Sequence, residues 1–375
     1  MERIFIIGGT GHIGGAVLHK TVEKYSDAAV TALVRGEEKA KRIVTKYPNV
    51  KPLIGDLESF DVIEAASRGA DIVINAGPDI THDRAIEAVI NGCKQGCRGG
   101  LSSEVVGAET FAVKARPTQG YYIHTSGAST LWDEPTGSRE ARTWDDVDDI
   151  QDIVAVSIDT DRTHAVTDKL VRDATADVNV AIISPGFVGG MSPSIEHPVP
   201  ITTPGIVRTA RAFKSPFQIA QGENRHAWIH VEDIADMYLL LVAKALASDQ
   251  SCWGKEAYYF GVAEVIGFSE AMQTLGPVLL KHGVMESAEM RSVDADDAAK
   301  ACLYGDSYTE DSVPPPADSW AIQIAILFGV NMRLRATRMT QLGWKPQKGP
   351  IVGTFDEVFG NYLRVEREAI RIRRE

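Results

Sequence analysis

The sequence predicts an α/β protein with a Rossmann-type, doubly wound parallel sheet and a smaller C-terminal lobe that binds substrate. Through residues 1–184, short apolar runs alternate with helix-length segments, which is the pattern of parallel strands joined by crossover helices. The runs are continuous rather than alternating, as expected of strands buried on both faces. Residues 185–375 lack this rhythm, so we assign them to the smaller lobe and expect some of them to return to the main sheet.

Six apolar runs mark the expected strands, and helical periodicity fills several of the intervals between them. The strands are predicted at residues 3–7, 29–34, 50–54, 71–75, 121–124 and 178–183. Helices are predicted at 14–25 and 37–47, from about residue 81 onward, and at 237–247, where an apolar stretch indicates a core helix. Two stretches, the acidic 132–161 and the proline-containing 285–318, are predicted to be solvated loops, helix ends or linkers.

The composition argues against several classes of protein. Hydrophobic residues make up 44% and charged residues 24% of the 375 residues, which suits a globular protein with a large core. The net charge of −12 disfavours binding to nucleic acid or an anionic membrane, because the summed field repels phosphate. The sequence shows no signal-peptide pattern and no apolar run long enough to span a membrane. No histidine or second cysteine pair lies near Cys93 and Cys97 at the spacing of a metal site. We therefore expect a cytoplasmic protein without a metal site and without nucleic-acid or membrane partners.

The strongest motif is the glycine-rich turn after the first predicted strand. Gly8, Gly11 and Gly14 have the G-x-x-G-x-x-G spacing, with a strand before them and a helix after them. The first glycine permits a sharp turn, the second lets backbone approach a pyrophosphate, and the third lets the helix pack on the strand. Free N–H groups at the helix N-terminus then attract the phosphates of a dinucleotide. The other residues predicted to line this turn are Thr10, His12 and Ile13.

The end of the second predicted strand indicates which dinucleotide is bound. Sites for NAD carry an acidic residue there, about 20 residues after the glycines, which binds the ribose 2′-hydroxyl. This chain has Arg35 at that position, and a cation there would pair with the 2′-phosphate of NADP(H). Lys39 and Lys41 add positive charge nearby, so we predict NADP(H) as the cofactor. Glu37 and Glu38 remain alternative ligands of a ribose.

Further short motifs follow the glycine-rich turn in order along nearly the whole chain. They read VRG, GDLES, INAGP, IHTSGAS, ISPGFVGG, WIHVEDIADMYLLLV and RMTQLGWKP. Together with GGTGHIGG, this series resembles the extended and atypical short-chain dehydrogenases, including the NmrA-like and epimerase-like groups, and is most similar to fungal members that act in secondary metabolism. The resemblance implies further cofactor contacts from Asp56, Leu57, Ala76, Gly77, Thr125, Lys169, Pro185 and Gly186.

The resemblance also implies an active site with Tyr-x-x-x-Lys after the fifth strand, and this chain departs from it. In the family, the tyrosine exchanges a proton with the substrate, while the lysine lowers the tyrosine pKa and holds the ribose. In DTDRTHAVTDKLVRDA, Lys169 matches the lysine, but Ala165 stands in place of the tyrosine. Ser126 matches the catalytic serine or threonine of the strand end, and Gly127 follows where a further serine is usual. Tyrosine-based ketone reduction is therefore not predicted.

Other side chains can take the place of the missing tyrosine. His164 titrates near neutral pH and is one candidate acid or base. The alternatives are Asp161, Asp168, Tyr304 and Tyr308. A substrate that is already activated, such as an iminium ion or a conjugated enone, would need less help from an acid.

Two features of the sequence concern the substrate. Epimerases of nucleotide sugars place an arginine before the I-H-V segment to bind the diphosphate, whereas NRHAWIHV has His226 at that position. Several aromatic residues are predicted either to line an apolar pocket for an aromatic substrate or to pack in the core. They are Trp132, Phe187, Phe213, Phe217 and Trp320.

Three functions remain open on this basis. The first is an NADP(H)-dependent oxidoreductase or epimerase-like enzyme that acts on a small organic carbonyl or imine. The second is a non-redox enzyme, such as an isomerase or an alkaloid cyclase of the Pictet-Spengler type, that uses acid–base residues alone. The third is an NmrA-like sensor that binds NADP(H) without turnover. Substrate identity and oligomeric state are not predicted.

Overall fold

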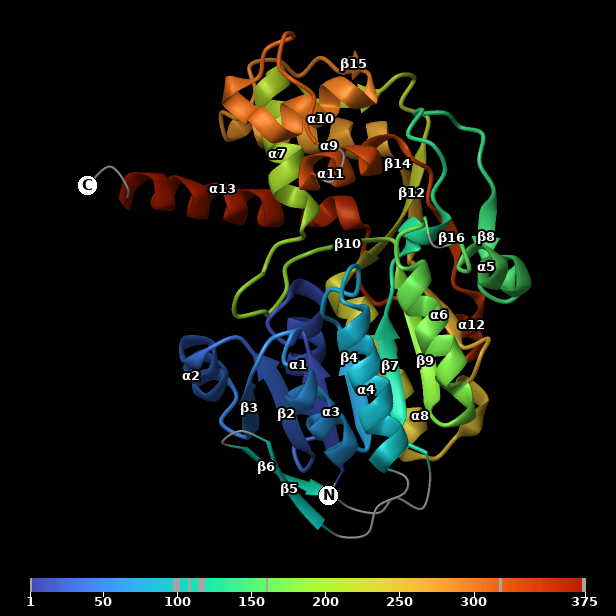
Figure 1. Cartoon of the computed structure of the whole chain (residues 1–375). Helices are drawn as coiled ribbons and strands as arrows, with labels where there is room; N and C mark the ends of the chain where they lie inside the picture. The colour runs from blue at the N-terminus through green and yellow to red at the C-terminus, as the bar shows by residue number, and fades with distance from the viewer. Residues whose placement is uncertain are drawn as a thin grey trace.

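A seven-stranded parallel sheet forms the centre of the larger lobe (Figure 1). The computed structural model describes residues 2–96, the strands 102–106 and 109–113, and residues 119–159, 161–316 and 319–372. In spatial order the strands are β3 (Val50–Ile54), β2 (Ala29–Val34), β1 (Arg3–Ile7), β4 (Ile72–Asn75), β7 (Tyr121–Thr125), β9 (Asn179–Pro185) and β13 (Tyr258–Gly261). From β1 the sheet extends to β2 and β3 on one side and to β4 on the other, which is the doubly wound arrangement. In such sheets, ligands bind at the carboxyl ends of the strands beside this change of direction.

All six predicted strands are confirmed, because continuous apolar runs such as IFII and IVIN are buried on both faces of the sheet. β1 lies between its neighbours with Ile4 opposite both Val30 and Ile72. The seventh strand, β13, comes from a later segment of the chain and pairs in parallel with β9. Part of the chain beyond residue 185 therefore returns to the main sheet.

Helices cover both faces of this sheet. On one face, α1 packs against α8, and on the other α3, α4 and α6 lie side by side. The helices of this lobe include α1 (His12–Lys24), α2 (Glu37–Lys46), α3 (Phe60–Gly69), α4 (Asp83–Gly96), α6 (Ala165–Asp173) and α8 (Val231–Leu246). The predicted core helix is confirmed as the second half of α8, where Leu241 and Val242 are fully buried. Within the described ranges, no helix is both long enough and apolar enough to cross a membrane.

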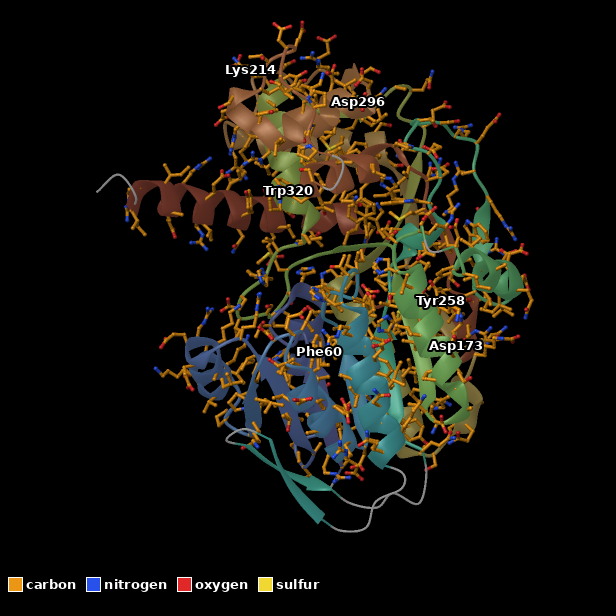
Figure 2. All side chains as sticks on the ribbon, in the orientation of Figure 1. Phe60, Asp173, Lys214, Tyr258, Asp296 and Trp320 are labelled. Carbon is orange, nitrogen blue, oxygen red and sulfur yellow. The ribbon has the colours of Figure 1, made fainter. Side chains whose placement is uncertain are left out.

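The smaller lobe lies beyond the carboxyl ends of the strands (Figure 1). In Figure 2, Phe60 marks the larger lobe, and Lys214, Asp296 and Trp320 mark the smaller one. A three-stranded sheet, with β12 between β10 and β14, connects the smaller lobe to the end of β9. The main elements of this lobe are β10 (Phe187–Gly189), α7 (Thr202–Phe213), β11 (Phe217–Ile219), β12 (Arg225–His230), β14 (Glu264–Gly267), α9 (Phe268–Lys281), β15 (Arg291–Val293), α10 (Ala295–Tyr304), α11 (Trp320–Gly329) and α13 (Phe355–Ile372).

The prediction that residues 285–318 form a loop or linker is wrong for their first half. This half contains β15, which pairs with β11, and α10, which packs against α7 and α11. The helix begins at Asp294, whose carboxylate accepts a hydrogen bond from the N–H of Asp297, and it buries Ala298, Ala301 and Cys302. The acidic residues here are thus the exposed start of a helix rather than part of a loop.

The acidic cluster within 132–161 is also partly misassigned. Strand β8 (Thr143–Asp145) pairs with β16 (Arg333–Arg335), and α5 (Ile150–Val156) follows. Asp146 is fully buried. Its carboxylate accepts hydrogen bonds from the backbone N–H of Phe260 at 3.0 Å and of Arg338 at 2.8 Å. A carboxylate that binds two distant backbone segments is a structural residue, and sequence spacing does not show that.

Candidate active site and cofactor cleft

The glycine-rich turn between β1 and α1 has no space for side chains at its two key positions. A Cβ on Gly8, whose φ is +80°, would lie 2.5 Å from the backbone of Ala76 and Gly77. A Cβ on Gly14 would lie 2.2 Å from the carbonyl oxygen of Gly8. Gly11, which precedes the first turn of α1, offers no side-chain cap for the N–H groups there. Such free N–H groups are the ones that the sequence predicts to bind a pyrophosphate.

The other predicted cofactor contacts follow strand ends along the same edge of the sheet. Arg35 follows β2, is exposed, and has no recorded partner within the described part of the chain. Lys39 on α2 forms an ion pair with Glu196 at 3.2 Å. The remaining positions lie at the ends of β7 and β9 or shortly after β3, β4 and β9, and comprise Asp56, Leu57, Ala76, Gly77, Thr125, Pro185 and Gly186. All of these stay predicted contacts, now shown to share one edge of the sheet.

A buried cluster of ionisable and polar side chains lies at the centre of this edge. We call it the polar cluster: Asp79, His124, Ser126, His164 and Asp168. Asp79 comes from the loop after β4, His124 and Ser126 from the end of β7, and His164 and Asp168 from the start of α6. Four of the five side chains are almost completely buried, whereas that of His164 is 12% exposed. His164 is therefore the member of the cluster that a substrate can reach.

His164 is held by Asp79. Its Nδ1 lies 2.7 and 2.8 Å from the two carboxylate oxygens of Asp79, and the hydroxyl of Thr167 donates to the same carboxylate at 2.7 Å. Burial by itself lowers the pKa of His164, but the hydrogen bonds and charge of Asp79 outweigh it and raise this pKa above its usual value. Burial would raise the pKa of Asp79, yet His124 and His164 hold it far below its usual value. Asp79 therefore favours the protonated form of His164, and the two imidazoles favour the ionised form of Asp79.

Gly127 makes space for this imidazole. A Cβ at that position would lie 2.5 Å from His164 Nε2, so any other residue would push the ring away. Since Nδ1 is bound to Asp79, Nε2 is the nitrogen that can exchange a proton with a substrate. His164 also has φ of +65°, a conformation that a non-glycine residue adopts only when its surroundings enforce it. The glycine after Ser126 and the histidine of α6 therefore belong to one arrangement.

The second half of the polar cluster surrounds Asp168. Its Oδ2 accepts hydrogen bonds from the hydroxyls of Ser126 at 3.0 Å and of Tyr258 at 3.3 Å, and complete burial raises the pKa of this carboxyl. His124 lies between the two carboxylates, with Nε2 3.6 Å from Asp79 and 4.0 Å from Asp168. Its Nδ1 is 3.0 Å from the hydroxyl of Tyr122. The cluster thus contains two carboxyls and two imidazoles within short distances.

The structure does not bring the other candidate catalytic residues to this cluster. Lys169 lies on the outer side of α6, where its side chain is 51% exposed and pairs with Asp173 (Figure 2). Helix α6 instead turns Asp168 and Val171 inward, and Lys169 falls on the opposite face. Asp161 is exposed on the loop before α6. Tyr304 and Tyr308 belong to the smaller lobe, where Tyr308 packs edge-on against Phe213.

Sequence reasoning missed Asp79, His124 and Tyr258. Asp79 follows the INAGP motif directly, and a polar residue just past the end of a parallel strand is a usable signal. His124 was hidden within an apolar strand, and a buried histidine there is equally typical of core packing. Tyr258 comes from β13. The sequence around this strand does not indicate that it pairs with β9.

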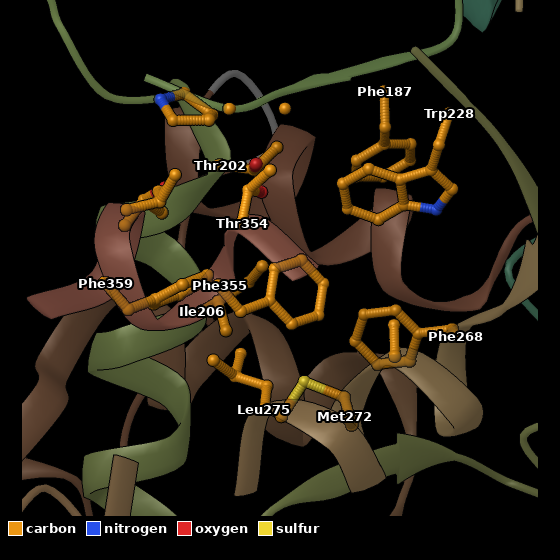
Figure 3. A pocket seen from close by; sticks show the side chains of 16 residues that line it. Phe187, Thr202, Ile206, Trp228, Phe268, Met272, Leu275, Thr354, Phe355 and Phe359 are labelled. Carbon is orange, nitrogen blue, oxygen red and sulfur yellow. The ribbon is translucent and has the colours of Figure 1, made fainter. Parts of the chain in front are cut away.

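A small apolar pocket of about 20 Å³ lies in the smaller lobe, directly after β9 (Figure 3). Phe187, Trp228 and Phe268 line one side, and Met272 and Phe355 line the other. The indole Nε1 of Trp228 is buried and has no hydrogen-bond partner within the described residues. The pocket therefore offers mainly apolar contacts.

The aromatic residues singled out from the sequence have different places. Phe187 lines the pocket, Phe213 and Phe217 pack in the core of the smaller lobe, and Trp132 is half-buried. The pocket assignment is wrong for Trp320, whose side chain lies on the surface of α11 near the guanidinium of Arg208.

His226, the residue at the epimerase diphosphate position, is fully buried and stacks on Phe187 at 4.5 Å. Burial lowers its pKa to about 4, so it is neutral and inaccessible to a diphosphate.

The cysteines give no indication of a metal centre. Cys93, Cys252 and Cys302 are buried in different elements, and Cys97 lies outside the described residues. Among the residues that the structure describes, no group of three or more histidine, cysteine or acidic side chains has the arrangement of a metal site.

Comparison with known proteins agrees with this geometry. Residues 8–99 match the model of an NAD(P)H-binding family. The chain is 24% identical over 388 residues to the oxidase ucsJ of Acremonium sp, with 99% of each chain covered. The structure of a dTDP-glucose 4,6-dehydratase from Bacillus anthracis in complex with NAD superimposes with a TM-score of 0.60 at 12% identity, covering 98% of both chains. The structure of vestitone reductase from alfalfa superimposes with a TM-score of 0.55 at 16% identity, covering 96% of this chain and 97% of the reductase. The chain thus contains an NAD(P)H-binding domain and has the fold of the extended short-chain dehydrogenases and NAD-dependent epimerases.

Proposed function

We propose that this protein is an NADP(H)-dependent oxidoreductase that acts on a small organic carbonyl or imine and uses His164 as its proton donor. One observation carries the proposal. A hydrogen-bonded His164–Asp79 pair, with a glycine beside it, lies at the sheet edge where the glycine-rich turn also opens. His164 is an acid at that edge and takes the role of the motif tyrosine, in whose place the chain has Ala165.

The residues that would hold the dinucleotide are those of the turn, from Gly8 to Gly14, together with Arg35 and Lys39 toward a 2′-phosphate. When bound, a reduced nicotinamide supplies a hydride to an electrophilic carbon. His164 donates the proton from Nε2 to the substrate oxygen or nitrogen that gains negative charge, and it then regains a proton from solvent. Asp79 holds the ring by Nδ1 and stabilises its protonated form, while Thr167 fixes the carboxylate.

The substrate class follows from what the lobe offers. The buried, neutral His226 leaves the epimerase diphosphate position without a cation, so a nucleotide sugar is disfavoured. The pocket of about 20 Å³ is lined mainly by apolar side chains, so the small part of a substrate that would enter it is apolar. The similarity to an oxidase supports redox chemistry in general.

A non-redox enzyme is the second candidate, because the polar cluster contains an acid and potential bases that need no cofactor. An isomerase or a cyclase of the Pictet-Spengler type would use His164 to protonate an imine and a carboxylate to remove a proton. The third candidate, an NADP(H) sensor, keeps the turn and would not use the cluster.

Two measurements separate these candidates. Titration of the purified protein with NADPH and NADH, followed by nucleotide fluorescence, is expected to show binding, with NADPH tighter. Incubation with a panel of aromatic ketones, enones and cyclic imines is then followed both by NADPH absorbance and by product chromatography. NADPH consumption supports the oxidoreductase, whereas product formed with unchanged cofactor supports the non-redox enzyme. Tight binding without any turnover supports the sensor, and no binding of either nucleotide contradicts the cofactor assignment.

A further inference from the structure

The segment between β10 and α7 crosses from the smaller lobe onto the glycine-rich turn. We call residues 191–199 the strap; in Figure 1 it descends toward α1 and α2. Within it, Ser192 donates a hydrogen bond to the carbonyl of His12 and Ser194 donates to that of Thr10, both at 2.7 Å. The strap is therefore attached by side-chain hydrogen bonds to the same backbone that would hold the pyrophosphate.

A second glycine beside the motif is explained by the strap. A Cβ on Gly15 would lie 2.6 Å from the Cβ of Ser194, so the strap contacts α1 only because residue 15 has no side chain. The spacing of the dinucleotide motif requires Gly14 and makes no demand on Gly15. This close contact is an observation independent of the cofactor.

The strap also binds the cations of α2. Glu196 is 16% exposed and pairs with Lys39 at 3.2 Å and with Arg42. Arg42 also donates to the carbonyl of Ile195, and Lys46 to that of Pro193. One carboxylate and two carbonyls thus bind three of the four cations of this helix, Lys39, Arg42 and Lys46. Lys39 is one of the residues that the sequence assigns to the 2′-phosphate of NADP(H).

We propose that Glu196 is a specificity-determining residue that competes with the 2′-phosphate for Lys39. This inference rests on the proposed function, since it requires that the dinucleotide binds at the turn. A 2′-phosphate carries more negative charge than a carboxylate, so NADP(H) displaces Glu196 and detaches the strap from α2. NAD(H) has a hydroxyl there and leaves the pair intact. The residues that flank the strap, Gly190 and Pro200, both line the apolar pocket, so its release reaches the substrate lobe.

The test compares the affinities of two charge-matched variants for NADPH and NADH at low ionic strength. Glu196→Gln removes the competing charge, and its affinity for NADPH is expected to rise about fivefold, the effect of one partly exposed ion pair. Its affinity for NADH should stay within about twofold, and the gain for NADPH should shrink as salt is added. Glu64→Gln is the control, because it removes a carboxylate from the Glu64–Arg68 pair on α3, away from the strap.

The outcomes distinguish this inference from the proposed function. An unchanged ratio of NADPH to NADH affinity in Glu196→Gln overturns the inference and leaves the cofactor assignment intact. Weaker binding of NADH by this variant also overturns it, since Glu196 would then be a ribose ligand. If the wild-type protein binds neither nucleotide, both proposals fail.

A measurement on the wild-type protein needs no variant to fold. Hydrogen exchange of the strap amides is expected to be faster with saturating NADPH than with saturating NADH. Equal exchange with the two nucleotides overturns the proposed displacement.

Discussion

His164 combines features that seldom occur together in one residue. It is not a glycine, yet its φ is positive, which costs on the order of 1 kcal/mol and requires compensation. The two Nδ1 contacts with Asp79 supply that compensation, and Gly127 provides the space for the ring. A strained, anchored imidazole at the mouth of a buried cluster is typical of a residue kept for chemistry rather than for packing.

Replacing His164 by Gln is expected to reduce kcat by about 10²–10⁴-fold, because the amide retains a hydrogen bond to Asp79 and cannot transfer a proton. Lys169→Met is the matched control on the same helix and should change kcat by less than about threefold, since its half-exposed amine pairs with Asp173 and not with the polar cluster. Steady-state kinetics with a substrate found in the screen would decide this. Equal losses of kcat in the two variants would indicate that Lys169 has the catalytic role expected of the family's lysine.

The pH dependence of turnover should depend on Asp79. A reduction requires protonated His164, so kcat/KM is expected to fall as the pH rises through the pKa of this residue. Asp79 raises that pKa, which places the fall above pH 6.5 in the wild-type protein. In Asp79→Asn the fall should move to lower pH, whereas Asp173→Asn should leave the profile in place. A profile that does not move in Asp79→Asn would show that another group donates the proton.

At the scale of the elements, parallel strands bring the site together. β4 and β7 are neighbours, so the residues that follow them, Asp79 and Ser126, emerge at one edge, and α6 adds His164 across that edge. The same edge carries the turn between β1 and α1. The packing of α1 on β1 therefore sets the position of the cofactor relative to the cluster.

Gly14→Ala tests this packing. Its Cβ would lie 2.2 Å from the carbonyl oxygen of Gly8, so α1 must move, with a loss of roughly 1–3 kcal/mol in the free energy of unfolding. Nucleotide affinity should fall with it. Gly9→Ala is the neighbouring control, because a Cβ there first meets the side chain of Leu18 at 3.4 Å. Thermal unfolding and nucleotide titration of both variants would measure the two effects, and similar behaviour of the two would argue against the required contact.

At the scale of the whole molecule, single residues connect distant parts of the chain. Asp146 binds the N–H of Phe260 in β13 and that of Arg338 at the start of α12 (Thr337–Gln341), so the acidic segment joins the main sheet to the C-terminal part. The strap forms a second connection, between the smaller lobe and α2. The two lobes are thereby joined at both ends of the cofactor edge.

Asp146→Ala is expected to leave two buried N–H groups without an acceptor, at roughly 1–3 kcal/mol each. Unfolding should remain cooperative, with Tm lowered by about 5 °C or more. Asp148→Ala, in the same acidic run but exposed, should change Tm by less than about 2 °C. Calorimetry on both variants checks this, and equal Tm values would mean that the buried carboxylate contributes little.

The sequence by itself determined the parts of this protein that depend on local rules. Short, mostly apolar runs predicted the six strands, because the strands of a parallel sheet are largely buried, and the glycines of the turn are required by backbone geometry at Gly8 and Gly14. Ser126 was a candidate because it lies directly after a predicted strand, and His164 because it is an imidazole next to the position of the missing tyrosine. The prediction that residues 285–318 are a loop failed, because α10 is stabilised by contacts with α7 rather than by local pattern.

Only the tertiary structure decided which of these candidates act together. Asp79, His124 and Asp168 are separated by up to 89 positions in the sequence, and they meet because β4, β7 and α6 end at one edge of the sheet. The same packing turned Lys169 to the surface and brought Glu196 onto α2. Strands and tight turns follow from the properties of neighbouring residues, whereas a cluster of charges buried away from water exists only where distant segments exclude that water together.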